Sequence, residues 1–241
     1  MMSNKTVEKL NQSRIAIIPA RGGSKRIPGK NIRSFLGKPI LAYSIETALA
    51  SGLFSEVMVS TDDSKIAEIA EQYGATIPFL RSRRNADDFA TTTDVLLEVL
   101  EEYHQRARHF DVLCCIYPTA VFINTIKLGD SLEQMESANA DSTLPIVQFG
   151  YPVQRGLRVD KKNRIRYVAP ENRYKRSQDL EDIYHDAGQF YWLHTKAFMM
   201  EKDLILKNNV PFRVSELEVQ DIDREVDWTL AEIKYTLMID V

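Results

Sequence analysis

The sequence contains little cysteine, and its two cysteines, Cys114 and Cys115, are adjacent in an apolar segment. Consecutive side chains of a strand point to opposite faces, so a disulfide between these two thiols is disfavoured. Unpaired buried thiols are typical of a reducing compartment, which predicts a cytoplasmic protein. A catalytic thiol is the weaker interpretation, because no charged partner stands nearby in the sequence.

Long hydrophobic runs are also absent. No apolar segment approaches the roughly 20 residues that a membrane-spanning helix needs. Residues 1–13 form a polar lead that lacks the apolar centre of a signal peptide. We therefore expect no association with a membrane.

A large excess of charge of one sign is missing as well. The net charge of −3 and the isoelectric point near 5.9 disfavour a general nucleic-acid binder. A hydrophobic content of 44% and a charged content of 27% are ordinary for a soluble globular protein. The predicted partners are therefore small molecules.

The two best-known phosphate-binding motifs are not present. A Walker A loop has four residues between its glycines, whereas five separate Gly23 from Gly29. Asn31 follows Lys30 at the position where that loop needs a hydroxyl group. No G-x-G-x-x-G occurs either, so the usual dinucleotide fingerprint is excluded.

The chain does contain an alternation of strand and helix patterns. The predicted strands cover residues 15–19, 56–62, 76–80, 111–117, 142–149 and 187–193, and the predicted helices cover residues 38–52, 64–73, 92–103, 126–137 and 224–239. This order predicts one α/β domain, residues 14–241, with a mostly parallel Rossmann-like sheet covered by helices on both faces.

Two details of the later part of the chain are specific expectations. Residues 157–167 alternate around a polar turn and predict a β-hairpin. Residues 151–183 are therefore interpreted as an inserted sub-domain that serves as a lid or in dimerisation. In the last helix, we expect four apolar residues to face the core. They are Val226, Leu230, Ile233 and Leu237.

The clearest functional signal is the stretch IAIIPARGGSKRIPGKN, residues 15–31. An apolar strand runs directly into a basic, glycine-rich loop. Glycines let backbone N–H groups approach an anion closely, and Lys and Arg side chains neutralise its charge. Ligands of open parallel sheets bind at the carboxyl ends of strands, where this loop lies. The alternative interpretation is a basic surface turn.

Two further stretches are ambiguous from the residues alone. Residues 81–93, RSRRNADDFATTT, are either a nucleotide contact or a polar loop that ends in a helix cap at Thr91. Asp221 and Asp223 stand at i and i+2, so in an extended segment their carboxylates point the same way and fit a hard cation. Asp223 also suits the N-cap of the last helix, and we assign it both roles.

The loop PARGGSKRIPGKN resembles the signature of the cytidylyltransferases that activate eight- and nine-carbon keto-sugar acids, the CMP-sialic acid, CMP-pseudaminic acid and CMP-Kdo synthetases. The resemblance implies an α/β nucleotidyltransferase that joins CTP and a sugar acid, releases pyrophosphate and requires Mg²⁺. It also implies a homodimer. The runs YPVQR at 151–155, RSQDL at 176–180 and HDAGQFYW at 185–192 resemble the pseudaminic acid branch.

The resemblance also implies roles for individual residues. The implied nucleotide-binding residues are Ala20, Arg21, Gly22, Gly23, Ser24, Lys30, Asn31, Arg81, Asp88 and Thr92. The implied sugar-binding residues are Tyr117, Thr119, Gln154, Arg155, Asp186 and Gln189. The implied catalytic residues are Arg21, Lys30 and Asp221, with Mg²⁺ held by Asp221 and Asp223. The partner of the sugar carboxylate stays open among Gln154, Arg155 and Gln189, and no general base is singled out.

Some positions depart from the family pattern. Tyr117 stands where relatives usually have Gln, and Ala187 stands where sialic acid synthetases have Asn. Both follow strands that end near the sugar, so the departures predict a different sugar and not a lost activity. The alternatives are the same reaction on sialic or legionaminic acid and, more remotely, a non-enzymatic module that binds anions or nucleic acid.

Overall fold

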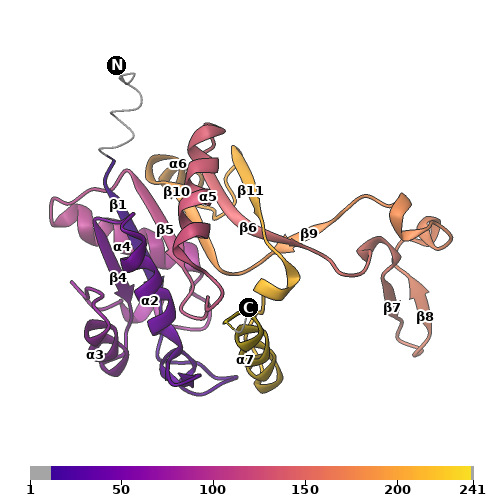
Figure 1. Cartoon of the computed structure of the whole chain (residues 1–241), viewed down its shortest axis with the longest axis horizontal. Helices are drawn as coiled ribbons and strands as arrows, with labels where there is room; N and C mark the ends of the chain where they lie inside the picture. The colour runs from indigo at the N-terminus through magenta and orange to yellow at the C-terminus, as the bar shows by residue number, and fades with distance from the viewer. Residues whose placement is uncertain (1–11, 240–241) are drawn as a thin grey trace.

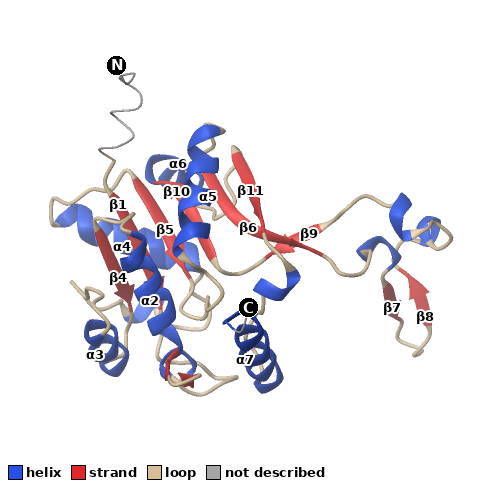
Figure 2. Cartoon of the chain, in the orientation of Figure 1, coloured by secondary structure: helices blue, strands red, loops and turns tan. Residues whose placement is uncertain are grey.

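The computed structural model describes residues 12–239 and is built around a seven-stranded sheet with the order β11-β6-β10-β5-β1-β4, in which β9 pairs with β6 (Figures 1 and 2). The strands of this sheet are β1 (Arg14–Pro19), β4 (Glu56–Ser60), β5 (Val112–Ile116), β6 (Ser142–Gln148), β9 (Tyr184–Asp186), β10 (Phe190–His194) and β11 (Asn209–Arg213). β1 pairs in parallel with β4 and β5, and β11 pairs in parallel with β6. β10 runs antiparallel to both β5 and β6. The predicted mostly parallel α/β sheet is confirmed, with β9 and β10 as the reversed strands.

Helices cover both faces of the sheet because its central strands are apolar on both sides. The helices are α2 (Ile40–Ser51), α3 (Ser64–Gln72), α4 (Thr92–Gln105), α5 (Thr125–Ser137), α6 (Thr195–Glu201) and α7 (Glu225–Ile239). Ile18 and Cys114 pack with residues of α2, α3 and α5, whereas Ile17 and Cys115 pack with residues of α4 and α6. The two cysteines are buried, free and on opposite faces, as predicted.

Local signals in the sequence explain where several helices begin and end. The Asp63 side chain accepts the backbone N–H groups of Lys65 and Ile66 at the start of α3. Thr91 and Asp94 form a capping box at the start of α4, as predicted for Thr91. Gly52 follows α2 with a φ of 65°, a left-handed conformation that glycine adopts without strain.

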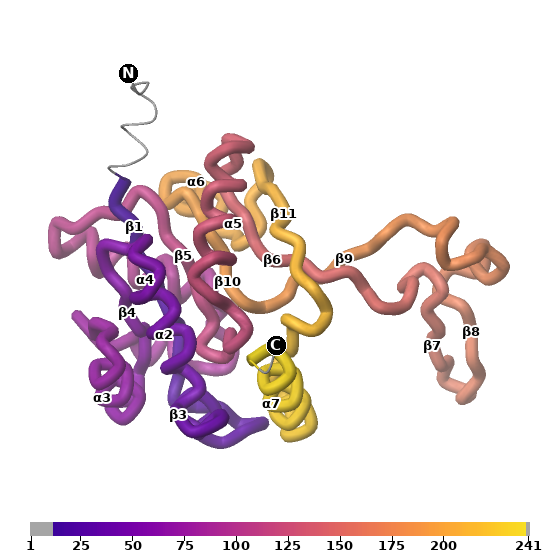
Figure 3. Tube along the Cα trace, in the orientation of Figure 1, coloured from indigo at the N-terminus to yellow at the C-terminus, as the bar shows by residue number. Residues whose placement is uncertain are grey.

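An arm projects from the sheet domain between β6 and β9 (Figure 3). It carries the hairpin of β7 (Leu157–Val159) and β8 (Ile165–Tyr167), in which Val159 pairs with Ile165. The predicted hairpin is therefore confirmed, whereas a lid or dimerisation role for residues 151–183 stays a prediction. A second small pair joins β2 (Ser34–Phe35) to β3 (Lys38–Pro39). The 3₁₀ helices are η1 (Lys30–Ile32), η2 (Arg83–Asn85), η3 (Val153–Arg155), η4 (Pro170–Asn172), η5 (Ser177–Asp179) and η6 (Glu216–Glu218).

The predicted buried face of the last helix is wrong. Val226, Leu230, Ile233 and Leu237 are all exposed. α7 instead buries Trp228 and Ala231, and its aromatic side chains pack edge-on against Phe35, whose ring centroid lies 5.6 Å from that of Trp228 and 5.7 Å from that of Tyr235. These aromatic side chains bury more apolar area than the aliphatic stripe would, which decides the face.

The predicted strand over residues 76–80 is also wrong. Thr76 forms one isolated bridge with Met58, and the chain then leaves the sheet. Pro78 has no backbone N–H to donate, so the apolar run cannot continue as a ladder. Between residues 12 and 239, no helix is long and apolar enough to cross a membrane.

Candidate active site

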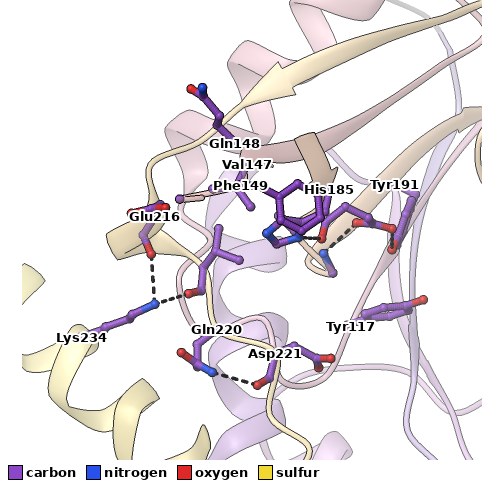
Figure 4. Close-up of a pocket in the computed structure, with 15 residues that line it drawn as sticks. Tyr117, Val147, Gln148, Phe149, His185, Tyr191, Glu216, Gln220, Asp221 and Lys234 are labelled. Atoms are coloured by element: carbon purple, nitrogen blue, oxygen red, sulfur yellow. Dashed lines mark hydrogen bonds between the residues drawn. The ribbon is translucent and has the colours of Figure 1, made fainter. Parts of the chain in front are cut away.

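Two cavities adjoin at the carboxyl ends of β1 and β5, and Tyr117 and Asp221 line both. The loop cavity, about 340 Å³, is lined by Pro19, Arg21, Ser24, Lys25, Arg26, Ile27, Lys30, Asn31, Arg81, Asp88, Ala90, Thr91, Thr92, Val95, Tyr117, Pro118, Thr119 and Asp221. The arm-side cavity, about 740 Å³, is lined by Tyr117, Val147, Gln148, Phe149, Gly150, His185, Asp186, Ala187, Gly188, Tyr191, Glu216, Val219, Gln220, Asp221 and Lys234 (Figure 4). A molecule in one cavity can therefore meet a molecule in the other beside Tyr117 and Asp221.

The loop after β1 brings most of the predicted nucleotide-binding residues into the loop cavity. Those that line it are Arg21, Ser24, Lys30, Asn31, Arg81, Asp88 and Thr92. Ala20 is buried behind the loop. Gly22 is required by close packing, because a Cβ there would lie 2.6 Å from Asp63 Oδ2. At Gly23, no atom of residues 12–239 other than its two chain neighbours lies within 4 Å of the same position, so packing among these residues does not demand a glycine there.

Asp88 acts as the counter-ion of the loop cations. Arg21 Nη1 donates to Asp88 Oδ1 at 3.0 Å and to the Asp87 carbonyl oxygen at 2.8 Å, and the Lys25 ammonium pairs with the same Asp88 carboxylate. The Lys25 hydrogen bond is the main reason why the pKa of Asp88 lies below its usual value. A triphosphate would compete with Asp88 for these cations, and a direct contact between Asp88 and a nucleotide stays a prediction.

Lys30 lies between the loop and the two predicted metal ligands. Its Nζ donates to the Ile222 carbonyl oxygen at 2.6 Å and lies 3.8 Å from Asp223 Oδ1. Burial lowers the pKa of the Lys30 ammonium, against the opposing effects of Asp223 and Asp221. Arg26, which the sequence did not single out, also forms an ion pair with Asp223.

Asp221 and Asp223 fit a cation that also binds substrate phosphates. Burial, and then the neighbouring Asp223 charge, raise the pKa of Asp221, so its carboxylate lacks a full set of favourable partners. Among residues 12–239, no cluster of three or more acidic, His or Cys side chains could hold a metal alone. Mg²⁺ is usually bound by one or two carboxylates together with phosphate oxygens, which matches this pair.

Asp223 is not the cap of α7, which corrects that half of its predicted double role. Asp227, in the first turn of α7, accepts the backbone N–H groups instead. Its Oδ2 accepts the backbone N–H of Arg224 at 2.8 Å and that of Asp223 at 3.2 Å. The Asp223 side chain therefore remains available to pair with Arg26 and Lys30 or to bind a metal ion.

Arg81 and Thr92 also line the loop cavity. The Arg81 guanidinium is buried, and its Nε donates to Ser60 Oγ at 3.1 Å. Burial lowers the Arg81 pKa to about 10. The Thr92 hydroxyl lies 3.2 Å from the Tyr117 hydroxyl, so a residue of the loop cavity contacts a residue that lines both cavities.

Asp186 supports the arm-side cavity through a short network. The Tyr191 hydroxyl donates to Asp186 Oδ2 at 2.6 Å, and the Gly188 N–H donates to Asp186 Oδ1 at 2.7 Å (Figure 4). Burial raises the pKa of Tyr191 far above its usual value, so its phenol remains a proton donor. Asp186 thus fixes the left-handed turn at Gly188, whose φ is 62°.

The other predicted sugar-binding residues are dispersed. Tyr117 lines both cavities, whereas Thr119 lines the loop cavity. Gln189 is buried, and its Nε2 donates to the Glu218 carbonyl oxygen. Gln154 and Arg155 lie in the arm, where Gln154 Nε2 donates to the Glu181 carbonyl oxygen at 2.6 Å. A sugar contact for these last three residues stays a prediction.

The structure also adds site residues that the sequence analysis missed. Lys25 and Arg26 were part of the basic loop, and their charge could have indicated them. Glu216 and Lys234 line the arm-side cavity, although they belong to η6 and α7. No local motif marks either residue, because tertiary packing alone brings these elements to the cavity.

The profile of the family described as "Cytidylyltransferase" matches residues 15–236. The chain belongs to this family. It is 41% identical to a pseudaminic acid cytidylyltransferase of Campylobacter jejuni over 92% of this chain and 95% of that protein. It is 32% identical to a CMP-N,N'-diacetyllegionaminic acid synthase of Legionella pneumophila over 90% of this chain and 94% of that protein. The family implied by the loop motif is therefore confirmed.

The fold of this cytidylyltransferase is also found among solved structures. A CMP-2-keto-3-deoxy-manno-octonic acid synthetase complexed with CTP superimposes with a TM-score of 0.67. The two sequences are 18% identical, and the match covers 95% of this chain and 100% of that chain. This likeness confirms the Rossmann-like α/β fold.

Proposed function

We propose that this cytidylyltransferase transfers the CMP group of CTP to a nonulosonic acid, with pseudaminic acid as the preferred acceptor. The observation that carries the proposal is the pair of adjoining cavities, which share Tyr117 and Asp221. The loop cavity concentrates cations for a triphosphate, and the arm-side cavity has room for a nine-carbon sugar. The 41% identity to a pseudaminic acid cytidylyltransferase supports this choice of sugar.

The proposed reaction is an in-line displacement. The anomeric hydroxyl oxygen of the sugar attacks the α-phosphorus of CTP, its proton passes to solvent, and the bond from this phosphorus to the α,β-bridging oxygen breaks to release pyrophosphate. Arg21 and Lys30 stabilise the charge on the α-phosphate and on the leaving group. Arg81 and Thr92 orient the cytidine part. Such transfers depend more on positioning and charge neutralisation than on covalent catalysis.

Mg²⁺ is the proposed cofactor, with Asp221 and Asp223 as its protein ligands. When bound, it would neutralise phosphate charge and polarise the attacking hydroxyl group. The Asp223 carboxylate is paired with Arg26 and lies near Lys30, so these cations must share or give up that contact when the metal binds. We further propose a cytoplasmic homodimer, in line with the two free, buried cysteines and the exposed apolar side chains of the arm.

Substrate choice can be tested by measuring pyrophosphate release from CTP with a panel of nonulosonic acids. Polar groups left unpaired by a wrong substrate cost several kcal/mol, so kcat/KM for pseudaminic acid should exceed that for N-acetylneuraminic acid by at least about 100-fold. Chelation of divalent cations should abolish turnover, and added Mg²⁺ should restore it. Equal or better use of N-acetylneuraminic acid would contradict the choice of sugar and leave cytidylyl transfer in place.

Legionaminic acid is the second candidate acceptor. The 32% identity to a legionaminic acid synthase favours it over more distant sugars. The same panel decides between the two acids, because both carry a carboxylate beside the reacting anomeric hydroxyl group and differ in stereochemistry. A kcat/KM for legionaminic acid above that for pseudaminic acid would select this alternative.

A further inference from the structure

The arm-side cavity presents an electrostatic problem for an acidic sugar. Three carboxylates line it, those of Asp186, Glu216 and Asp221. Among the described residues that line this cavity, the only Lys or Arg is Lys234. A sugar carboxylate placed here without a cation would face like charges on several sides, which is unfavourable in a partly desolvated site.

The candidates considered from sequence do not meet this need within one chain. The Arg155 guanidinium lies 5.7 Å from the centre of the Tyr151 ring, and its Nη1 donates to Ser177 Oγ within the arm. Gln154 is bonded to the backbone of Glu181, and Gln189 is buried. None of these three side chains lines the arm-side cavity.

Lys234 is held with its ammonium group at the cavity wall. Its Nζ donates to the Val219 carbonyl oxygen at 2.6 Å and to the Glu216 carbonyl oxygen at 3.1 Å (Figure 4). An ammonium has three N–H donors, so these two contacts leave one for a ligand. The ammonium needs little reordering to bind an anion, because both carbonyls fix its position and α7 is anchored by buried Trp228.

We propose that Lys234 binds the carboxylate of the sugar acid. This inference rests on the proposed function, because it requires an acidic acceptor in the arm-side cavity. The charge-assisted contact would place the carboxylate beside α7 and leave the anomeric hydroxyl free to face Asp221 and the loop cavity. Lys234 thereby selects acids over neutral sugars of similar size.

The test compares steady-state kinetics of Lys234→Gln with the wild type, using CTP and pseudaminic acid. Gln can still donate to a backbone carbonyl but carries no charge. Loss of a hydrogen bond to a charged group should raise the KM for the sugar about 10- to 100-fold. The KM for CTP and the melting temperature should stay unchanged. Lys196→Gln, on the exposed side of α6, is the matched control and should leave all three values unchanged.

A second measurement separates charge recognition from support of the fold. The C1 carboxamide of pseudaminic acid is tested as a competitive inhibitor of both enzymes. The wild type should bind the acid much more tightly than the carboxamide, and Lys234→Gln should lose most of this preference. Lys234→Arg should recover part of it, because the charge is restored.

Three results would overturn the inference while the proposed function stands. One is an unchanged KM for the sugar in Lys234→Gln. Another is an equal loss of affinity for the acid and the carboxamide. The third is a joint change in the KM for CTP and in the melting temperature, which would make Lys234 a clamp for residues 216–221. If the wild type accepts no nonulosonic acid, the proposed function itself is wrong and the inference is overturned with it.

Discussion

At the scale of single residues, Lys30 combines three features that suit a transition-state contact. It lines the loop cavity, its ammonium is partly desolvated, and it lies beside the predicted metal ligands. A cation in such a place interacts more strongly with developing charge than one in water does. Burial lowers the pKa of Lys30, and nearby Asp223 partly offsets this effect.

We therefore expect Lys30→Ala to lower kcat by about 100-fold or more, as loss of a preorganised electrostatic partner does. The fold should survive, because Lys30 begins the short 3₁₀ helix η1 after the basic loop and its side chain belongs to no hydrophobic core cluster of the described residues. The measurement is kcat with CTP and pseudaminic acid, together with a thermal melt. Lys65→Ala, on an exposed face of α3, is the control. An unchanged kcat would remove Lys30 from the catalytic residues.

Single residues also mark what sequence reasoning could and could not reach. The basic loop within residues 15–31 and the cap at Thr91 could be predicted, because each depends only on residues that are close together in the sequence. The assignment of Asp88 to the nucleotide stays a prediction, whereas its ion pairs with Arg21 and Lys25 could not be predicted. Which ion pairs form depends on how the loops meet in space, and the spacing of residues does not contain that information.

At the scale of elements, α7 positions the segment of the two predicted metal ligands through Asp227. The side chain of Asp227 accepts the backbone N–H of Asp223, so the cap and the site share one hydrogen bond. The prediction from sequence made Asp223 the cap, whereas Asp227 accepts the backbone N–H groups. It also assigned the wrong face of α7 to the core. α7 has an aliphatic face and an aromatic face. The aromatic face is turned to the core, because Tyr235 packs against Phe35 and Tyr43.

Asp227→Ala should lower the melting temperature near neutral pH by about 2 to 4 °C, a typical effect of losing a cap in a chain of this size. The hydrogen bond from Arg224 is the main cause that lowers the pKa of Asp227 below its usual 3.8. A lowered acid pKa stabilises the folded state above pH 3.8, and this stabilisation is lost as the pH falls through the folded-state pKa. The difference in melting temperature should therefore shrink below about pH 4.

Asp223→Asn is the matched comparison at this scale. It should lower Mg²⁺-dependent turnover strongly and leave the melting temperature almost unchanged, because its ion pair is with the exposed Arg26, Lys30 lies 3.8 Å away, and its side chain does not cap α7. A stability loss in Asp223→Asn as large as that in Asp227→Ala would contradict this division of roles.

At the scale of the whole molecule, the alternation of strands and helices was sufficient to predict an α/β domain with an inserted hairpin. The reversed direction of β10 was not predictable, because it depends on how the chain returns from the arm and enters the sheet between β5 and β6. The arm-side cavity was hidden for the same reason. Its walls come from β6, η6, β10 and α7, which are far apart in the sequence.

The side chains of the arm are mostly exposed in one chain. Its hairpin leaves Leu157, Val159, Ile165 and Tyr167 exposed. Two-stranded hairpins are marginally stable in water, so an arm of this kind gains most from packing on another surface. A second copy of the chain is the partner expected for the predicted homodimer.

The whole-molecule prediction is that the wild type has the mass of a dimer in multi-angle light scattering. The double variant Val159→Lys and Ile165→Lys should have the mass of a monomer. These two residues pair across the hairpin, so the change places two like charges together in the expected interface. Lys161→Ala and Lys162→Ala, together at the turn of the same hairpin, control for general effects on the arm and should leave the dimer intact. A wild type that is monomeric at micromolar concentration, or a double variant that stays dimeric, would contradict dimerisation through the arm.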